Sequence, residues 1–193
     1  MLRVWGVLLF AATLTTAVLA NDTTTTTGRG HPVLTFAGQR LECPTCRLLC
    51  RELAHHSSQP EHQAPEGAAR RDPDQYVQFL SRPSRLDSIL RNAVATTSSM
   101  CVLQRNLLDD VTTQFVHCES ATFSIDGQVV PRPKPPKGLR EYVESLLREE
   151  EEGEVGGGGV RQMLAQEYTK EEMEWSLCVE RAKVCPKGRE KDL

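Results

Sequence analysis

The sequence lacks the short motifs that mark several common classes of active site. It contains no Gly-x-Gly-x-x-Gly dinucleotide fingerprint, no Gly-x-Ser-x-Gly nucleophile elbow and no His-Glu-x-x-His zinc-protease helix. It also has no surplus of basic side chains, because 23 lysines and arginines face 26 aspartates and glutamates. Phosphate binding needs a basic surface, so this balance argues against nucleic acid as a general partner. We therefore expect a protein that is not an enzyme and that needs no cofactor.

Long apolar runs are also scarce, and the one present lies within residues 1–20. Arg3 supplies a positive charge, Val4–Val18 is apolar apart from its threonines, and Val18-Leu19-Ala20 fits a cleavage site. Residues 1–20 are therefore predicted to be a signal peptide, and its removal would leave 173 of the 193 residues. A membrane anchor is the alternative, but the run is short and interrupted, so we expect no stable membrane insertion. Asn21-Asp22-Thr23 would then be an exposed glycosylation sequon with Asn21 as acceptor.

Cysteine is what the chain has in quantity, with seven residues, all after position 42. In an exported protein such a set indicates a disulfide framework with one thiol left over. Cys43-Pro-Thr-Cys46 opens one predicted helix, and Cys178 and Cys185 close the last one. If these two helices pack antiparallel, the natural pairing is nested, with Cys43 bonded to Cys185 and Cys46 to Cys178. Each bridge would close a loop worth on the order of 5 kcal/mol in the chain-entropy model.

Helical periodicity marks both ends of the chain, and β-periodicity marks its centre. Helices are predicted over 43–56, from about 84, over 139–152 and from about 160, with a break at the capping box Thr169–Glu172. Pro44 suits the first helical position, which would make Cys43 the N-cap, and Pro186 should stop the last helix at Cys185. A continuation or restart of the second helix through 100–108 is left open.

The centre of the chain predicts a small hairpin. Its evidence is the β-branched segments 111–118 and 121–125, the Asp126-Gly127 turn signal and a return strand over 128–130. A leader over 21–38 is expected to be disordered, and residues 21–35, 57–74 and 153–159 are expected to be flexible.

These features together resemble the canopy family. The resemblance rests on the signal peptide, the Cys-x-x-Cys helix followed by Arg-Leu-Leu, the terminal Cys-x6-Cys with a short charged tail, and the acidic helix that begins at Glu141. It covers residues 40–193 and implies a canopy domain over 39–186, followed by a tail over 187–193. Canopy proteins are saposin-like, disulfide-bonded helical proteins of the endoplasmic reticulum that act as chaperones or co-chaperones. The expected fold class is therefore mainly α, a saposin-like disulfide-stapled helical domain with a small β-hairpin insertion.

The family has a third cysteine pair, one on each of the two middle helices. Here Val143 stands where we place the second member, and the pattern of residues 86–94 suggests a valine in place of the first. Cys101 and Cys118 would then form a substitute bridge from helix two to the hairpin. In the rival alignment Cys101 is the family's third cysteine and its partner is missing. Cys50 is extra under either alignment; a buried thiol is expected, and a bridge to Cys101 or Cys118, or an intermolecular disulfide, is the alternative.

The chain ends in Glu190, Lys191, Asp192 and Leu193, which resemble the Lys-Asp-Glu-Leu retention signal without matching it. Combined with the family resemblance, this tail predicts a variant retrieval address and a location in the lumen of the endoplasmic reticulum. Secretion is the alternative location.

Three functional hypotheses follow. The first is a non-enzymatic lumenal chaperone or co-chaperone that binds client proteins or other chaperones through a partly apolar helical surface. The second is a thiol–disulfide oxidoreductase that uses Cys43 and Cys46, since a helix N-terminus lowers a thiol pKa, but the expected preceding strand is missing. The third is a secreted saposin-like lipid binder, against which the hairpin and the tail argue. A zinc site is disfavoured because six residues separate Cys178 from Cys185, and His55, His56 and His117 are expected at the surface or in loops.

Overall fold

A computed structural model describes residues 32–36, 38–107, 110–118, 124–125, 128–129, 134–148 and 159–187. Several predicted features lie wholly or partly outside these residues: the signal peptide, the Asn21 sequon, residues 21–31 of the leader, the Asp126-Gly127 turn, residues 149–152 of the acidic helix, the linker residues 153–158 and the tail residues 190–193. None of the described helices is long and apolar enough to span a bilayer.

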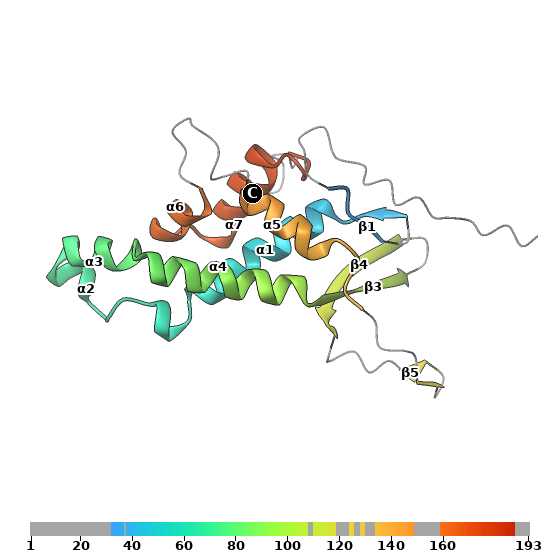
Figure 1. The fold of residues 1–193 in the computed structure, drawn as a ribbon, viewed down its shortest axis with the longest axis horizontal. Helices are drawn as coiled ribbons and strands as arrows, with labels where there is room; N and C mark the ends of the chain where they lie inside the picture. Colours follow the sequence, from blue (N-terminus) through green and yellow to red (C-terminus); the bar gives the residue numbers. More distant parts are fainter. Residues whose placement is uncertain are drawn as a thin grey trace, which may run out of the picture.

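The described residues form a mainly helical structure with three small two-stranded sheets (Figure 1). In chain order the elements are β1 (Thr35–Phe36), β2 (Gln39–Arg40), α1 (Glu42–Ser57), the 3₁₀ turn η1 (Pro60–His62), α2 (Ala68–Arg71), α3 (Pro73–Leu80), α4 (Pro83–Ser98), β3 (Met100–Leu107), β4 (Asp110–His117), β5 (Ser124–Ile125), β6 (Gln128–Val129), α5 (Leu139–Arg148), α6 (Val160–Ala165), α7 (Lys170–Met173) and the π-helix η3 (Glu174–Arg181). The prediction of a mainly α fold is confirmed at this level.

The central helix is α1, which is contacted by α4, α5, α7 and η3. The helical spacing of Cys43, Cys46, Cys50 and Leu53 predicts one buried stripe on this helix; Cys46, Cys50 and Leu53 are fully buried, as is Leu49, whereas Cys43 is partly buried. The helix begins at Glu42 after Leu41, so Cys43 is its second residue, and the N-cap prediction for Cys43 is wrong. Pro44 is tolerated there because the first-turn N–H groups have no partner within the helix.

The segment before α1 is more ordered than expected. Leu34 is buried in the core, and its carbonyl accepts a hydrogen bond from the Leu41 N–H at 2.8 Å. Thr35 pairs with Arg40 in the β1–β2 hairpin. The prediction of disorder is therefore wrong for residues 34–36 and 38, because burial of Leu34 compensates the entropy of ordering this short hairpin.

Residues 57–74 contain η1 and α2, where the sequence predicts a flexible loop. The physical reason lies in contacts from outside the segment. The Arg85 guanidinium donates to the His62 carbonyl at 2.7 Å, and the Asp72 carboxylate caps α3 by accepting the Gln75 N–H at 3.0 Å. Pro73 then occupies the first position of α3, a helix that the sequence analysis missed.

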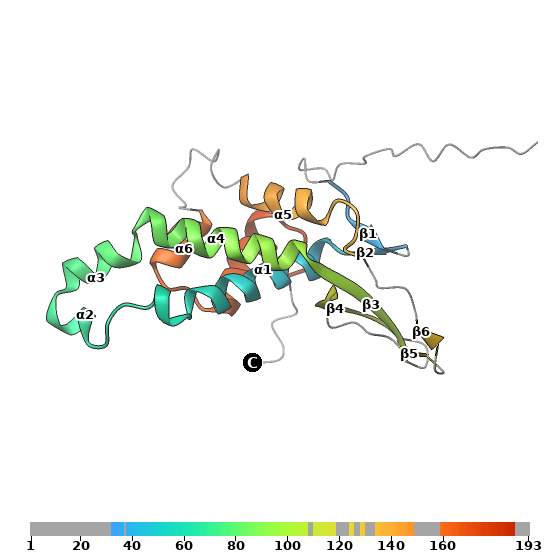
Figure 2. The same cartoon turned by 60° about the horizontal axis from the view of Figure 1, so that its bottom comes forward.

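The main hairpin pairs β3 with β4 from Met100↔His117 to Leu107↔Asp110. The strand predicted over 111–118 is confirmed, but residues 100–107 are its partner, so a continued helix there is wrong. The Ser99 hydroxyl donates to the Thr96 carbonyl at 2.8 Å and thereby competes with further helical hydrogen bonds. A second, shorter hairpin pairs Ile125 with Gln128, as the turn signal predicts. Figure 2 shows both hairpins at the end of the molecule opposite α2 and α3.

The remaining helices complete the core. Ile89 and Ala93 on α4, and Tyr142, Val143 and Leu146 on α5, are almost completely buried, as their periodicity predicts. The break before the last helix is also confirmed, because Thr169 and Glu172 form a reciprocal capping box. Beyond it, η3 has π-helical hydrogen bonding, as in the 2.8 Å bond from the Ala182 N–H to the Leu177 carbonyl. The helix ends at Arg181, before the Cys185 at which it was expected to stop.

Candidate functional site

The two ends of the domain are joined by two nested disulfides between α1 and the C-terminal segment. Cys43 bonds to Cys185 with a Cα separation of 4.7 Å, and Cys46 bonds to Cys178 with a separation of 5.8 Å. Both distances lie in the range that a disulfide requires. This is the pairing expected for antiparallel helices, and it places the two cysteines of Cys-Pro-Thr-Cys in different bridges.

A third disulfide joins Cys101 to Cys118 at a Cα separation of 5.0 Å and closes the base of the β3–β4 hairpin. The predicted Cys101–Cys118 bridge is therefore present, and neither cysteine is bonded to Cys50. Val143 is fully buried in the core. An apolar side chain there is consistent with a site that packs rather than crosslinks.

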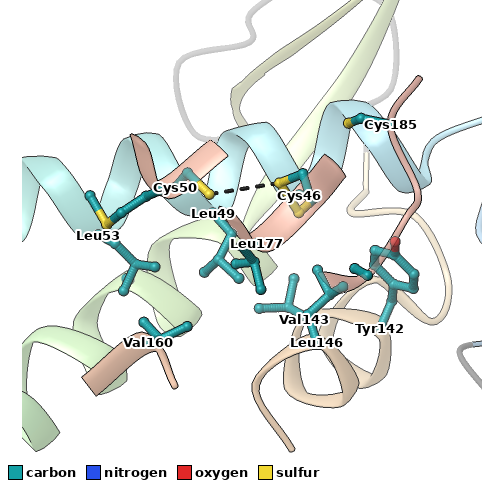
Figure 3. Close-up of a cluster of buried hydrophobic side chains, with 14 of the residues drawn as sticks. Cys46, Leu49, Cys50, Leu53, Tyr142, Val143, Leu146, Val160, Leu177 and Cys185 are labelled. Atoms are coloured by element: carbon teal, nitrogen blue, oxygen red, sulfur yellow. Dashed lines mark hydrogen bonds between the residues drawn. A yellow bond between two sulfur atoms is a disulfide. The ribbon is translucent and has the colours of Figure 1, made fainter. Parts of the chain in front are cut away.

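The extra cysteine, Cys50, lies against the inner disulfide (Figure 3). Its sulfur is 3.7 Å from Cys178 Sγ, and the sulfurs of Cys46, Cys50 and Cys178 all lie within 4.8 Å of one another. A disulfide sulfur carries no proton, so the Cys50 thiol is the donor in this contact. Three thiolates at these separations could bind a soft metal ion, but two of these sulfurs are bonded to each other. As described, the cluster is a buried thiol packed on a disulfide.

The sulfur cluster is sealed from solvent. Cys46, Cys50 and Cys178 are fully buried. Reactive thiols need partial exposure and an electropositive setting, and an apolar burial site disfavours the thiolate. The geometry therefore favours a structural role for all three sulfurs.

Hollows open on the surface of the part of the chain that the structure describes, and no sequence pattern predicts the two considered next. The first, which we call the α3 hollow, has a volume of about 630 Å³. It is lined by Ala64, Pro65, Ala68, Arg71, Asp72, Gln75, Tyr76, Gln78, Phe79 and Arg82. Small and aromatic apolar groups form much of its wall, and two arginines and one aspartate are its charged members.

The Phe79 ring of the α3 hollow is flanked by two guanidinium groups. Arg82 lies 5.4 Å from the ring centroid and Arg85 lies 5.7 Å from it, both within cation–π range. Arg85 is buried, and it donates to the His62 and Leu80 carbonyls at 2.7 and 2.9 Å. Burial lowers the pKa of Arg85, but an arginine remains charged in any case. Arg85 therefore holds in place both the Phe79 ring and the backbone at His62 and Leu80.

Tyr76 connects helix α3 to the turn between α6 and α7. Its hydroxyl donates to the Glu167 carboxylate at 2.6 Å, and this hydrogen bond raises the pKa of Tyr76. Glu167 lies in the turn between α6 and α7 with φ 53°, a left-handed conformation. The hydroxyl of Tyr76 is therefore engaged with that turn.

The second hollow lies between α4 and α5 and has a volume of about 610 Å³. Leu90 and Val94 give it an apolar floor, and Arg91, Arg140 and Glu144 are its charged members. The Arg140 Nε donates to Glu144 at 2.9 Å, and this bond raises the pKa of Arg140. Because Glu144 also faces Arg148 at 3.8 Å, its charge is compensated from two sides.

Large apolar side chains are exposed at three further positions. Val77 on α3 is 62% exposed, Trp175 on η3 is 48% exposed, and Tyr168 before α7 is 37% exposed. Single exposed apolar residues are normal on protein surfaces, so they define no site by themselves. Periodicity alone does not reveal the hollows, because the second joins residues 90–99 to residues 140–144 and the α3 hollow depends on how α2 and α3 pack within residues 64–82. Comparisons with protein-family models, with curated proteins and with solved structures each return no match.

Proposed function

We propose that this protein is a non-enzymatic chaperone or co-chaperone of the endoplasmic reticulum lumen with a saposin-like, canopy-type fold. It binds folding client proteins or other chaperones of the secretory pathway. The proposal rests on the sequence resemblance to the canopy family together with the nested, buried disulfide frame. An oxidising compartment suits such a frame, because disulfides persist there and are rare in the cytosol.

One observation carries the non-enzymatic part: both cysteines of Cys-Pro-Thr-Cys are bonded to residues more than 130 positions away. A thiol–disulfide oxidoreductase cycles between a dithiol and a local disulfide with an accessible sulfur. Here Cys46 is fully buried and Cys43 is bonded to the far end of the domain. Reduction would separate α1 from the C-terminal segment rather than convert a local disulfide into a dithiol.

The test is an insulin-reduction assay with the wild-type protein and with a Cys43→Ala/Cys185→Ala variant, each checked for folding by circular dichroism. A structural frame predicts no catalysis by either protein. Wild-type turnover that disappears in the folded variant would instead establish the oxidoreductase. In parallel, crosslinking in intact cells should recover folding secretory proteins or lumenal chaperones with the tagged protein, and recovery of none would refute the adaptor role.

Location is tested separately with the tail. Deleting Glu190–Leu193 should send the protein into the medium, because a retrieval receptor reads a free C-terminal address. Adding a short tag after Leu193 should have the same effect. Unchanged retention of both variants would show that this tail is not the address.

A further inference from the structure

We infer that the α3 hollow binds acidic peptide segments that carry an apolar side chain beside a carboxylate. The inference rests on the proposed function, because it names the kind of client segment that such an adaptor would bind. Its basis is a group of arginines whose charges are held in place by neutral partners.

The first observation is how Arg71 and Arg82 are positioned. The Arg71 guanidinium donates to the Glu66 carbonyl, and the Arg82 guanidinium lies over the Phe79 ring. A carbonyl and an aromatic ring orient an arginine without cancelling its charge. Among the described residues no carboxylate lies within ion-pair distance of either side chain.

Most of the other arginines whose side chains the structure describes differ from these two, although Arg70, Arg85 and Arg91 also have no carboxylate within ion-pair distance. Each of six others lies within ion-pair distance of a carboxylate: Arg40, Arg47, Arg51, Arg140, Arg148 and Arg161. The carboxylates of Asp72 and Glu167 both keep their charge near the α3 hollow, but only Asp72 lines it. Glu167 accepts the Tyr76 hydroxyl, and Asp72 accepts the Gln75 N–H. The hollow therefore presents two arginine charges against one aspartate charge.

The second observation is the wall between those charges. Ala64, Pro65, Ala68 and the half-buried Phe79 ring offer an apolar surface within a volume of about 630 Å³. Binding sites typically combine such a wall with a few convergent polar groups that fix orientation. A carboxylate can bind an arginine fork through two parallel hydrogen bonds, while a neighbouring apolar side chain packs on Phe79. Charge complementarity thus specifies an acidic, partly apolar occupant.

The experiment uses isothermal titration calorimetry with the unlabelled hexapeptide Glu-Leu-Glu-Glu-Leu-Glu and its counterpart in which glutamine replaces each glutamate. Wild-type protein should bind the acidic peptide more tightly than the glutamine peptide, and 0.5 M salt should weaken the difference through screening. Arg71→Gln and Arg82→Gln should each weaken acidic binding by roughly 3- to 10-fold. Arg70→Gln is the matched control, because Arg70 is exposed on the same helix α2 but does not line the hollow.

A gain-of-binding variant guards against loss through misfolding. Asp72→Asn removes the negative charge that opposes the peptide and keeps a side chain that caps α3 well. It should tighten acidic binding by about 2- to 5-fold, within the range of a single exposed charge interaction. Equal binding of the two peptides, or equal loss in Arg70→Gln and Arg82→Gln, would overturn the inference.

Two further results separate this inference from its alternatives. If the occupant were a second copy, sedimentation would show wild-type dimers that Arg82→Gln dissociates, and the inference would be wrong. If crosslinking recovers clients equally well with wild type and with Arg71→Gln/Arg82→Gln, the hollow is not their site, although the adaptor function stands. If the peptide binds as expected but no lumenal partner is recovered, the proposed function fails and the site remains.

Discussion

Removing the outer disulfide should cost far less than its length along the chain suggests. Taken alone, a bridge over 142 residues is worth about 5 kcal/mol in the chain-entropy model. However, the inner bridge already joins the same two segments over 132 residues. With that bridge intact, the outer one closes a ring of three residues on α1 and seven on the C-terminal segment. A ring of that size is worth only about 3 kcal/mol.

The comparison that tests this reasoning is with the hairpin bridge. Cys101 and Cys118 are separated by 17 residues and share no loop with the nested pair, so their bridge is also worth about 3 kcal/mol. Cys43→Ala/Cys185→Ala and Cys101→Ala/Cys118→Ala should therefore lower the free energy of unfolding by similar amounts in urea titrations. Removing both nested bridges together should cost about 8 kcal/mol, enough to unfold most small domains.

The outer bridge is the clean choice for this measurement because Cys43 is only half-buried, whereas Cys46 and Cys178 are fully buried. Replacing the inner pair would add a loss of core packing to the loss of the crosslink. A loss of 5 kcal/mol or more from the outer pair alone, with about 3 kcal/mol from the hairpin pair, would refute the nested-loop reasoning. So would a double removal that costs no more than the two single removals added together.

Three further perturbations test the packing and the electrostatics. Leu49→Ala should lower the free energy of unfolding by about 2–5 kcal/mol in urea, because this fully buried leucine would leave a cavity. Thr169→Ala should cost about 1 kcal/mol in the same titration through loss of the capping box; no change would contradict that role. Burial, and then the charge of His55, lower the pKa of His56 below its ordinary value of 6.5. The folded protein therefore binds fewer protons than the unfolded chain as the pH falls through 6.5, and stability should decrease there. His56→Gln should reduce this pH dependence of the unfolding midpoint, and an unchanged dependence would contradict the role of His56.

The pairing of the two nested disulfides was predictable because the order of the cysteines along each helix, together with antiparallel packing, decides which cysteines can meet. Cys43 and Cys46 lie near the start of one helix, and Cys178 and Cys185 lie at and beyond the end of another. Antiparallel packing then leaves one nested pairing. The inward faces of α1 and α5 were predictable for a similar reason, since each helix buries a continuous stripe of apolar residues.

Other parts depended on contacts that spacing does not encode. Residues 100–107 become a strand because β4 offers them a full set of backbone partners, and their own pattern is mixed. Residues 57–74 are ordered by the guanidinium of Arg85, which lies on a later helix. The contact of Cys50 with Cys178 was also missed, because Cys178 packs near two successive turns of α1 and bonds to only one of them. The α3 hollow is lined by residues 64–82, but it forms only where α2, α3 and the chain around them pack together, and helical periodicity does not report that packing.

The outer disulfide also decides how the molecule would respond to mechanical tension. A pull on the two ends of the chain reaches Cys43 from one side and Cys185 from the other, and the covalent bond between them carries the load. Helices α1 to η3 lie almost wholly inside this clamp and experience no extension. The β1–β2 hairpin lies outside it and would be peeled from the core first. Once the bridges are reduced, the same tension would act directly on α1 and η3 and would pull the domain apart from its centre.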